Sequence, residues 1–338
     1  MTNFKEILVQ KEYDFLYTNP HLGNNIILLG LGGSHAYGTN IETSDVDIRG
    51  IAMEKPENLL GFNHFEQVED PSTDTVIYAF NKMVQLLINN NPNIVEILGL
   101  RPDHYLYLSS LGKELLDHKH LFLSQKSYYT FGGYAKAQLK RLENALARDN
   151  YPEEKKNEHI CISLEAAIDA FNSQKGTDLN PAFAYVDENG ALRYRLNMDI
   201  DSRDLEAFYS TVSNTTKNYK ELLNRNRKKG DAKLCKHAMH LARLLATCLD
   251  LLNTGDIITY REKDHDLLMS IRNGEFMGED GNMTPEFYKL VADLETQCEE
   301  ALKTTKLPKK SNVNEIEKWV IDVNKRIING EFQEEFKL

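Results

Sequence analysis

Residues 26–50 read IILLGLGGSHAYGTNIETSDVDIRG, and this stretch decides the fold. It opens on a short apolar run between Gly23 and Gly30, which favours a buried strand over a helix. Residues 45–53 then alternate polar and apolar side chains with the two-residue period of a strand. The stretch therefore predicts two strands joined by a glycine-rich loop.

The loop between these strands has the composition of a phosphate-binding turn. Its glycines expose backbone N–H groups and Ser34 adds a hydroxyl donor, so a helix that begins here would bind a phosphate. A dinucleotide-binding fingerprint is excluded because His35 takes the third glycine position and residue 50 is glycine rather than an acid. A P-loop is excluded because residues 33–39 lack the required lysine.

Asp45 and Asp47 stand at positions i and i+2 of the second strand, so their carboxylates are expected on one face while Val46 turns to the core. Adjacent carboxylates repel each other, and a divalent cation or a shared proton relieves the repulsion. Oxygen ligands beside a phosphate site favour Mg²⁺. Two such ions, about 3.5–4 Å apart, can clamp both reacting oxygens at phosphorus, an arrangement that needs a third carboxylate from a neighbouring strand.

These motifs and their spacing resemble a known family. The string GGS, followed after ten residues by Asp-Val-Asp, is similar to the signature of the DNA polymerase β-like nucleotidyltransferases. The longer string GS-x-AYGT-x4-SD-x-D-x-RG, with NPNIVEIL at 91–98, resembles the RNA-ligase-associated branch of predicted nucleotidyltransferases. Segments at 236–245, 251–257 and 267–276 extend the resemblance into the second half of the chain.

The resemblance implies a role for each matching residue. Gly33 and Ser34 would bind the triphosphate, and Asp45 and Asp47 would hold two Mg²⁺ ions, with Mn²⁺ as the alternative ion. We therefore expect the resemblance to carry both a nucleotide site and a metal site.

The third carboxylate is expected at Asp74, which directly precedes the strand-like segment 75–78. Its rivals on the preceding loop are Glu66, Glu69 and Asp70. The third carboxylate would bind the catalytic metal and help to deprotonate the acceptor hydroxyl, which then attacks the α-phosphate and expels pyrophosphate.

Basic residues would complete the nucleotide site. Arg49 shares the parity of the two aspartates and would reach a phosphate or neutralise the carboxylates. Residues 215–243 contain nine basic and two acidic residues, which favours a groove for triphosphate or RNA, although the run at 225–229 alone favours a solvated loop. Lys236 and Arg243, nearly two helical turns apart on one face, are the expected nucleotide ligands in this region.

Other polar residues receive no site role. Tyr37 either stacks on a base or closes the loop, and the closing role is favoured. Asn91-Pro92 is read as a helix stop, and Glu96 as part of a new helix whose apolar neighbours belong to the core. The group formed by Cys235, His237 and His240 lacks a fourth ligand, so zinc is disfavoured.

The two halves of the chain differ in pattern. A helix is predicted over 4–19, and the strand 75–78 leads into a helix over 80–88. Beyond residue 124 helices dominate, interrupted by a hairpin over 181–197 with an Asn-Gly turn. These later helices are predicted over 125–148, 158–173, 203–223, 231–253, 285–304 and 312–329.

The fold class is therefore α+β or α/β, a small mixed sheet with flanking helices followed by a helical C-terminal domain. With the resemblance, residues 1–123 are expected to be the nucleotidyltransferase catalytic domain. Residues 124–338 are expected to be a mostly helical domain that binds the nucleotide and the acceptor.

Composition limits the function. The chain has 338 residues and a net charge of −11, with 41% hydrophobic and 27% charged residues, which fits a globular protein and excludes a non-specific nucleic-acid coat. Its apolar runs are much shorter than the roughly 18–20 residues of a membrane span, and residues 1–15 lack an apolar signal core. We therefore expect a cytoplasmic protein without a membrane association. The four widely spaced cysteines are expected to be core thiols.

The expected activity is Mg²⁺-dependent transfer of a nucleoside monophosphate from an NTP, ATP or CTP, to a hydroxyl acceptor, with release of pyrophosphate. RNA, such as a tRNA end, is the first expected acceptor. Two alternatives stay open. One is a protein-modifying (AMPylating), antitoxin-like nucleotidyltransferase, and the other is a catalytically silent nucleotide-binding module.

Overall fold

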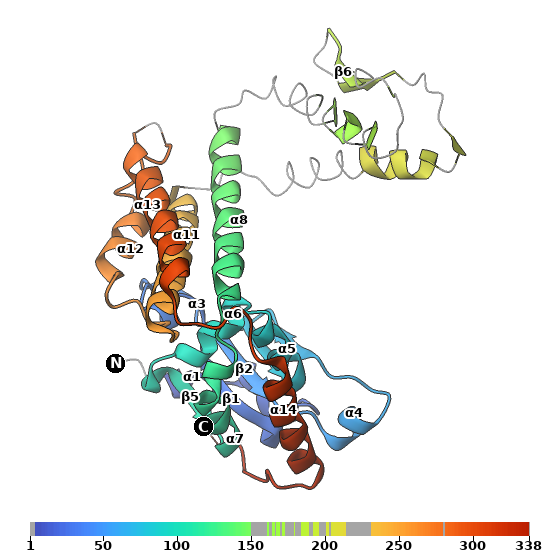
Figure 1. Ribbon diagram of the computed structural model, residues 1–338, viewed down its shortest axis with the longest axis vertical. Helices are drawn as coiled ribbons and strands as arrows, with labels where there is room; N and C mark the ends of the chain where they lie inside the picture. The colour runs from blue at the N-terminus through green and yellow to red at the C-terminus, as the bar shows by residue number, and fades with distance from the viewer. Residues whose placement is uncertain are drawn as a thin grey trace. The chain divides into compact units, whose positions relative to one another are not determined.

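The chain forms two compact units in the computed structural model, one made of residues 1–140 and 235–338 and the other of residues 141–234 (Figure 1). This division by contacts differs from the functional division at residues 123 and 124, which stays a prediction. The structure describes residues 4–149, 161, 164–165, 167–169, 171–172, 179, 184–188, 192–195, 201–202, 204–213, 231–279 and 281–337.

A mixed five-stranded sheet lies at the centre of the first unit, with strand order β3-β4-β2-β1-β5. Strand β2 runs antiparallel to β1 and parallel to β4, while β3 and β5 are antiparallel edge strands. The predicted mixed sheet with helices around it is thereby confirmed. The strands are β1 (Ile26–Leu31), β2 (Ile48–Ala52), β3 (Gln67–Asp70), β4 (Thr75–Ala79) and β5 (Tyr105–Leu108).

The core forms where apolar runs predicted it. All six residues of β1 are buried, as its unbroken apolar sequence requires between two neighbouring strands. Helix α5 (Phe80–Ile88) buries Phe80, Met83, Val84 and Leu87, the one apolar stripe that its helical spacing creates. Short helices α6 (Pro92–Val95) and α7 (Ser110–Asp117) follow, with the 3-10 helices η3 (Glu96–Gly99) and η4 (Pro102–His104) between them.

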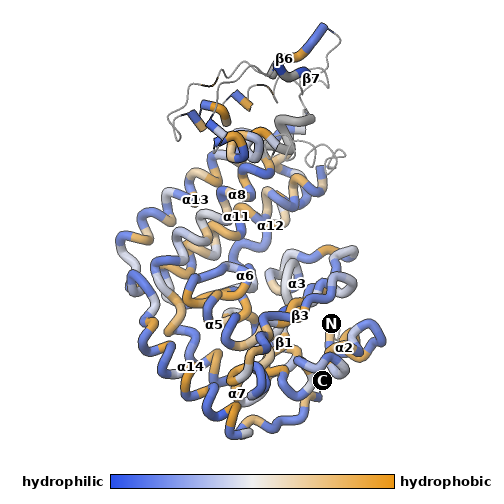
Figure 2. Tube along the Cα trace, turned by 90° about the vertical axis from the view of Figure 1, so that its right-hand side faces the viewer, coloured by the Kyte–Doolittle hydropathy of each residue, from blue (hydrophilic) through white to orange (hydrophobic). Residues whose placement is uncertain are grey.

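Long helices make up most of the C-terminal part, as predicted. Figure 2 shows hydrophobic and hydrophilic residues alternating along the traces of α11 and α13, as expected for helices with one apolar and one polar face. Helix α14 packs against helix α5, where the Trp319 ring contacts the Phe80 ring at 5.5 Å between centroids. These helices are α8 (Lys126–Asp149), α11 (Asp231–Thr254), α12 (His265–Arg272), α13 (Pro285–Thr304) and α14 (Val313–Ile328).

The N-terminal prediction of one helix over 4–19 was wrong. The segment forms helix α1 (Phe4–Ile7), a 3-10 turn, and helix α2 (Phe15–Thr18). Leu8, Tyr13 and Leu16 are all buried. A spacing of five residues between the first two would put them on different faces of a straight helix, so the chain bends to bury them together.

The second predicted strand begins later than expected. Its ladder starts at Ile48, which pairs with Leu31 and with Thr75, so Asp45 and Asp47 lie in the loop that precedes the strand. The edge strands β3 and β5 were not predicted, because short strands with half-exposed faces carry a weak alternation signal.

The described residues of the second unit include two antiparallel strands, β6 (Ala184–Val186) and β7 (Leu192–Tyr194), which confirms the predicted pair of strands. The predicted Asn-Gly turn between them lies outside the described residues. A small core of apolar side chains there includes Leu164, Ile168 and Phe208. The predicted helices over 158–173 and 203–223 lie only partly within the described residues, where 204–213 are helical.

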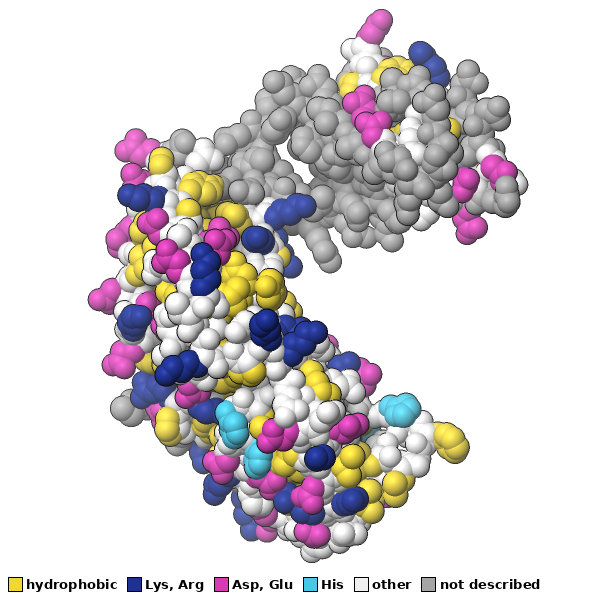
Figure 3. Space-filling model, viewed as in Figure 1, with side chains coloured by type: hydrophobic (Ala, Val, Ile, Leu, Met, Phe, Trp, Pro, Cys, Tyr) yellow, Lys and Arg dark blue, Asp and Glu magenta, His cyan; other side chains and the backbone are white. Residues whose placement is uncertain are grey.

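Three expectations from composition can be compared with the structure. All four cysteines are buried, as predicted for core thiols. Within the described ranges, no helix combines the length and apolarity needed to cross a bilayer. On the face in Figure 3, basic and acidic side chains are interspersed over the first unit. The basic run at 225–229 lies outside the described residues.

Candidate active site

The glycine turn sits directly against one of the predicted carboxylates. Gly32 and Gly33 join β1 to the five-residue helix α3 (Gly33–Tyr37), and the Gly32 N–H donates to the backbone oxygen of Asp47 at 2.8 Å. Gly33 has φ +53°, and a Cβ atom there would lie 1.5 Å from Asp47 Oδ2. Only glycine fits this position, because it tolerates the left-handed conformation and leaves room for the carboxylate.

Parallel pairing brings two of the predicted carboxylates together. Ile48 of β2 pairs with Thr75 of β4, so the residues that precede them, Asp47 and Asp74, occupy matching positions at the same end of two neighbouring strands. The two carboxyl groups lie close enough that each shifts the pKa of the other. Asp74 has φ 46°, a left-handed conformation that aspartate accepts more readily than most residues.

The rivals of Asp74 have other partners. Glu66 pairs with Lys82 at 2.9 Å on the surface, and Glu69 accepts a hydrogen bond from Gln67. Asp70 accepts hydrogen bonds from Ser72 and Thr73 within its own turn. Asp74 is thus the candidate that the structure brings to Asp47, and its catalytic role stays a prediction.

The two carboxyl groups titrate as a pair. Burial and then the neighbouring Asp74 raise the pKa of Asp47 to about 7. The hydrogen bond from Asp47, outweighing partial burial and helped by Arg49, lowers the pKa of Asp74. Without a cation and below about pH 7, the pair therefore shares one proton, carried by Asp47, which is one of the two ways to relieve carboxylate repulsion.

This proton predicts how stability depends on pH. The pKa of Asp47 is raised on folding, so its stabilising contribution is complete below about pH 4 and is lost as pH rises to about 7. Asp47→Asn keeps a hydrogen-bond donor that does not titrate. After a discount for the partial exposure of the side chain, we expect the free energy of unfolding of the variant to be about 1–2 kcal/mol higher than that of the parent at pH 8 without divalent cations.

Urea denaturation at pH 5 and pH 8 in EDTA measures this difference. The stability gain of Asp47→Asn should shrink at pH 5, where the parent carries the proton too. Equal gains at both pH values would contradict the shared proton.

The donor set at this position fits a divalent cation. Two carboxylates that hold a proton between them offer the oxygen ligands that Mg²⁺ prefers. Asp45 is exposed in the loop two residues before Asp47, and among the described residues no three His, Cys, Asp or Glu side chains form a metal-binding cluster. The structure therefore brings together two of the three predicted ligands.

Positive charge surrounds the carboxylate pair. The Arg49 guanidinium lies 3.1 Å from Asp74 Oδ1 and also donates to the backbone oxygens of Ile48 and Asp74. Lys236 of α11 is exposed. Its positive charge contributes to the lowered pKa of Asp74 and opposes part of the rise in the pKa of Asp47. Arg49 thus neutralises a carboxylate here, one of its two predicted roles.

Helix α11 presents a positive face near α3. Burial, followed by the charges of Arg243, Lys236, His237 and Arg272, lowers the pKa of His240 to about 3. The His240 ring meets the Tyr37 ring edge-on at 6.4 Å between centroids. His240 is therefore neutral at physiological pH and adds no charge to this face.

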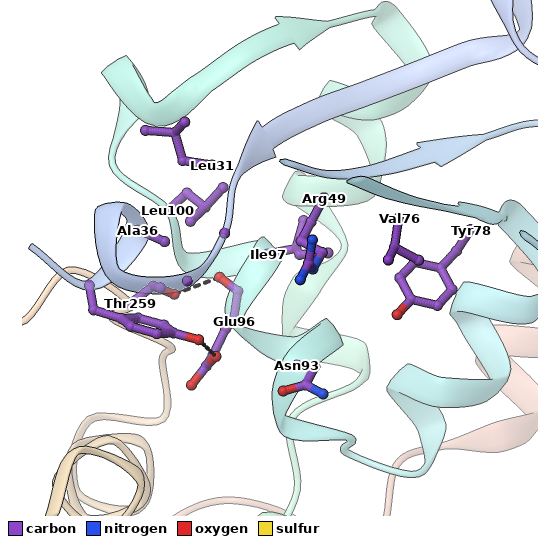
Figure 4. A pocket seen from close by; sticks show the side chains of 13 residues that line it. Leu31, Ala36, Arg49, Val76, Tyr78, Asn93, Glu96, Ile97, Leu100 and Thr259 are labelled. Atoms are coloured by element: carbon purple, nitrogen blue, oxygen red, sulfur yellow. Dashed lines mark hydrogen bonds between the residues drawn. The ribbon is translucent and has the colours of Figure 1, made fainter. Parts of the chain in front are cut away.

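A cavity of about 190 Å³ opens beside the glycine turn (Figure 4). Arg49 points into it in Figure 4, Tyr78 and Asn93 border it, and the Glu96 carboxylate at its edge accepts the hydrogen bond of the Tyr37 hydroxyl. Its lining also includes Gly32 and Gly33 from the turn, Val76 from β4, apolar side chains of Leu31, Ala36, Ile97 and Leu100, and Tyr37 and Thr259.

Arg243 occupies a different place from the one the sequence suggested. It is buried and forms an ion pair with Glu96, and its guanidinium stacks on the Tyr37 ring at 3.6 Å. Arg243 is not among the residues that line the cavity. Sequence reasoning assigned Glu96 to a core helix and missed this pair; the only available signal was a charged residue inside the apolar run NIVEIL.

Residues from the second half of the chain contact the end of helix α3 and the loop that follows it. The Arg261 N–H donates to the Tyr37 oxygen at 2.9 Å, and Arg272 donates to the Thr39 oxygen at 2.7 Å. At Gly38, φ is +74° and an added Cβ would lie 2.5 Å from the Tyr260 ring. Residues near 260–272 therefore hold the chain at Gly38 in place, a role that no sequence motif predicted.

The fold and the site can now be compared with known families. The mixed sheet with a helical C-terminal part, the glycine-serine turn after the first strand and the paired aspartates before two parallel strands are consistent with the polymerase β-like fold that the sequence resembles. Residues 4–161 match the family model described as the RNA repair pathway DNA polymerase beta family. This match confirms the predicted resemblance and supports a nucleotidyltransferase of RNA repair.

The matched residues end before the helical segments at 236–276, so the extension of the resemblance to those segments stays a prediction. No curated protein and no solved structure gave a significant match. The family match is therefore the comparison on which the functional argument rests.

Proposed function

We propose that the protein is a Mg²⁺-dependent nucleotidyltransferase that transfers a nucleoside monophosphate from an NTP, ATP or CTP, to a hydroxyl group of RNA. The observation that carries the proposal is the pairing of Asp47 with Asp74 beside Gly33. A carboxylate pair next to a turn rich in backbone N–H groups suits chemistry at phosphorus. The family description, which names RNA repair, supports the RNA acceptor.

The residues of the site would divide the work. Asp47, Asp74 and Asp45 would hold two Mg²⁺ ions, or Mn²⁺ in their place, which when bound supply Lewis acidity at the α-phosphate. The turn at Gly33 and Ser34 would bind the triphosphate. Asp74 would receive the proton of the acceptor hydroxyl. The hydroxyl oxygen then bonds to the α-phosphorus as the bond from that phosphorus to the leaving pyrophosphate oxygen breaks.

The remaining site residues would supply charge and space. Lys236, exposed beside the carboxylate pair, would offset the charge of the triphosphate. Arg49 would exchange its contact with Asp74 for a phosphate oxygen once a cation neutralises that carboxylate. The cavity beside Tyr78 and Asn93 would accept a nucleoside, because an aromatic ring and an amide can recognise a base.

The test is transfer of an α-labelled phosphate. Each of the four NTPs is incubated with the protein, Mg²⁺ and total RNA or lysate, and labelled products are digested with ribonuclease or protease. We expect ribonuclease-sensitive label that requires Mg²⁺ and disappears in an Asp45→Ala/Asp47→Ala variant.

Other outcomes of the same assay would overturn the proposal. Protease-sensitive label would identify a protein-modifying enzyme. NTP binding without any transfer would identify a catalytically silent module. Label that persists in the double variant would contradict the assigned site.

A further inference from the structure

Three side chains from distant parts of the chain meet in the interior behind the candidate active site. Tyr37 is the last residue of α3, Glu96 opens η3, and Arg243 lies in α11. The Tyr37 hydroxyl donates to Glu96 Oε2 at 2.8 Å, and Arg243 pairs with Glu96 Oε1. The Arg243 guanidinium carbon lies 3.6 Å from the centre of the Tyr37 ring, so each member contacts both others.

This cluster, which we call the Glu96 cluster, is almost fully buried. The Arg243 and Glu96 side chains are each 5% exposed. Burial alone would lower the pKa of Arg243, but Glu96 outweighs it and raises that pKa, so the arginine stays charged. A buried charge needs its partner, because water no longer compensates for it. Loss of the Arg243 charge therefore leaves the Glu96 carboxylate uncompensated beside the cavity.

The Glu96 cluster joins both elements that would handle the nucleotide. Tyr37 ends the five-residue helix that begins with Gly33 and Ser34, so its position sets the phosphate-binding turn. Arg243 follows Lys236 by seven residues on one helix, about two turns, so its position also sets the distance of Lys236 from the carboxylate pair. The Thr259 hydroxyl donates to the Glu96 backbone oxygen and holds the centre of the cluster.

We propose that Arg243, Glu96 and Tyr37 are positioning residues that hold the Gly33–Ser34 turn and Lys236 in register, and that Arg243 acts through Glu96 rather than by binding phosphate. The inference rests on the proposed nucleotidyltransferase activity. The inference replaces the nucleotide-binding role that was predicted for Arg243 from its spacing to Lys236. It also gives a role to Glu96, which the apolar residues around it in the sequence had suggested was part of a core helix.

Two roles for Arg243 make different kinetic predictions. A phosphate ligand would mainly affect binding of the NTP, and its loss would add to the loss of Glu96. A positioning residue would mainly affect kcat, because misplaced groups still bind the nucleotide but fail to align the reaction. Its effect would not add to that of Glu96, since both changes break one cluster.

The experiment measures kcat for transfer and the dissociation constant of a non-hydrolysable NTP for Arg243→Met, Glu96→Gln and the double variant. We expect kcat to fall about 10- to 100-fold in each single variant, with the double variant no worse than the poorer single one. The dissociation constant should change less than about threefold. Lys236→Met, in contrast, should weaken NTP binding in the parent protein.

Two conservative variants keep the test decisive if Arg243→Met does not fold. Tyr37→Phe removes only the hydroxyl, and we expect kcat to fall about three- to tenfold. Arg243→Lys keeps the charge but loses the planar stacking and should recover only part of kcat. Circular dichroism melting curves verify that each variant is folded under the assay conditions.

Arg101→Met is the matched control. Arg101 also contacts a carboxylate, Asp103, at 3.0 Å and lies over a tyrosine ring, that of Tyr260, but on the surface. The kcat of the Arg101→Met variant should equal that of the parent protein. Additive effects of Arg243→Met and Glu96→Gln, or a tenfold weaker NTP affinity of Arg243→Met alone, would overturn the positioning role. If the parent transfers no label at all, the proposed function has failed instead.

Discussion

An Asp74→Asn variant is expected to lose about 10²- to 10³-fold in kcat for nucleotide transfer while its stability changes little. The loss follows because asparagine offers a weaker metal ligand and cannot accept the acceptor proton. Stability changes little because the substitution relieves the repulsion between two carboxylates before β2 and β4 but also removes the partly exposed ion pair with Arg49, and these effects oppose each other. Activity lost without stability lost is the sign of a functional rather than a structural residue.

Asp70→Asn provides the comparison for Asp74→Asn. Asp70 was a rival for the third carboxylate and lies on the same segment, but its oxygens accept hydrogen bonds from Ser72 and Thr73. The substitution should lower stability slightly and leave kcat within about twofold, because surface changes usually have small effects. Steady-state kinetics and urea denaturation of both variants decide the assignment. A larger kcat loss in Asp70→Asn would move the third ligand to that residue.

A Gly33→Ala variant should lose about 10²-fold in kcat/KM, because a displacement of about 1 Å at a reacting centre has effects of this size. The added Cβ would lie 1.5 Å from Asp47 Oδ2, so the aspartate or the turn must move. Alanine also strains the backbone at φ +53°, by about 1–2 kcal/mol. The same substitution thus disturbs the phosphate-binding turn and the carboxylate pair.

Gly133→Ala is the matched control for this glycine. Gly133 lies within helix α8, and a Cβ there would meet no atom within 4 Å. The variant should be about 0.5–1 kcal/mol more stable, because alanine loses less entropy in a helix, and its kinetics should be unchanged. Thermal melts and transfer kinetics of both variants provide the measurement. A Gly33→Ala enzyme within about threefold of the parent would contradict the close packing of the turn on Asp47.

The sequence predicted the part of the site that is local in the chain. The buried strand, the glycine turn and the aspartates follow one another within 25 residues, so their spacing could be read directly. Asp74 was predicted for a related reason, since it precedes a recognisable strand. What spacing could not reveal was that Asp45 and Asp47 stand before β2 rather than within it, because the ladder begins where partners exist.

Contacts between distant residues were beyond the reach of local patterns. Arg243 was singled out because it falls on one helix face with Lys236, yet seven residues along a helix say nothing about what each side chain meets. Glu96 was assigned to the core because its neighbours are apolar. Burial of both together, with Tyr37, depends on how η3, α3 and α11 pack.

The amino-acid sequence by itself located strands β1, β2 and β4, the glycine turn and the candidate carboxylates, because each depends on residues close together in the chain. Only the tertiary structure decided which carboxylates meet and which arginine is buried in an ion pair. The physical reason is that the charge state and the partners of a carboxyl or guanidinium group depend on its surroundings. Pairing of β2 with β4 places Asp47 beside Asp74, and burial requires Arg243 to pair with Glu96.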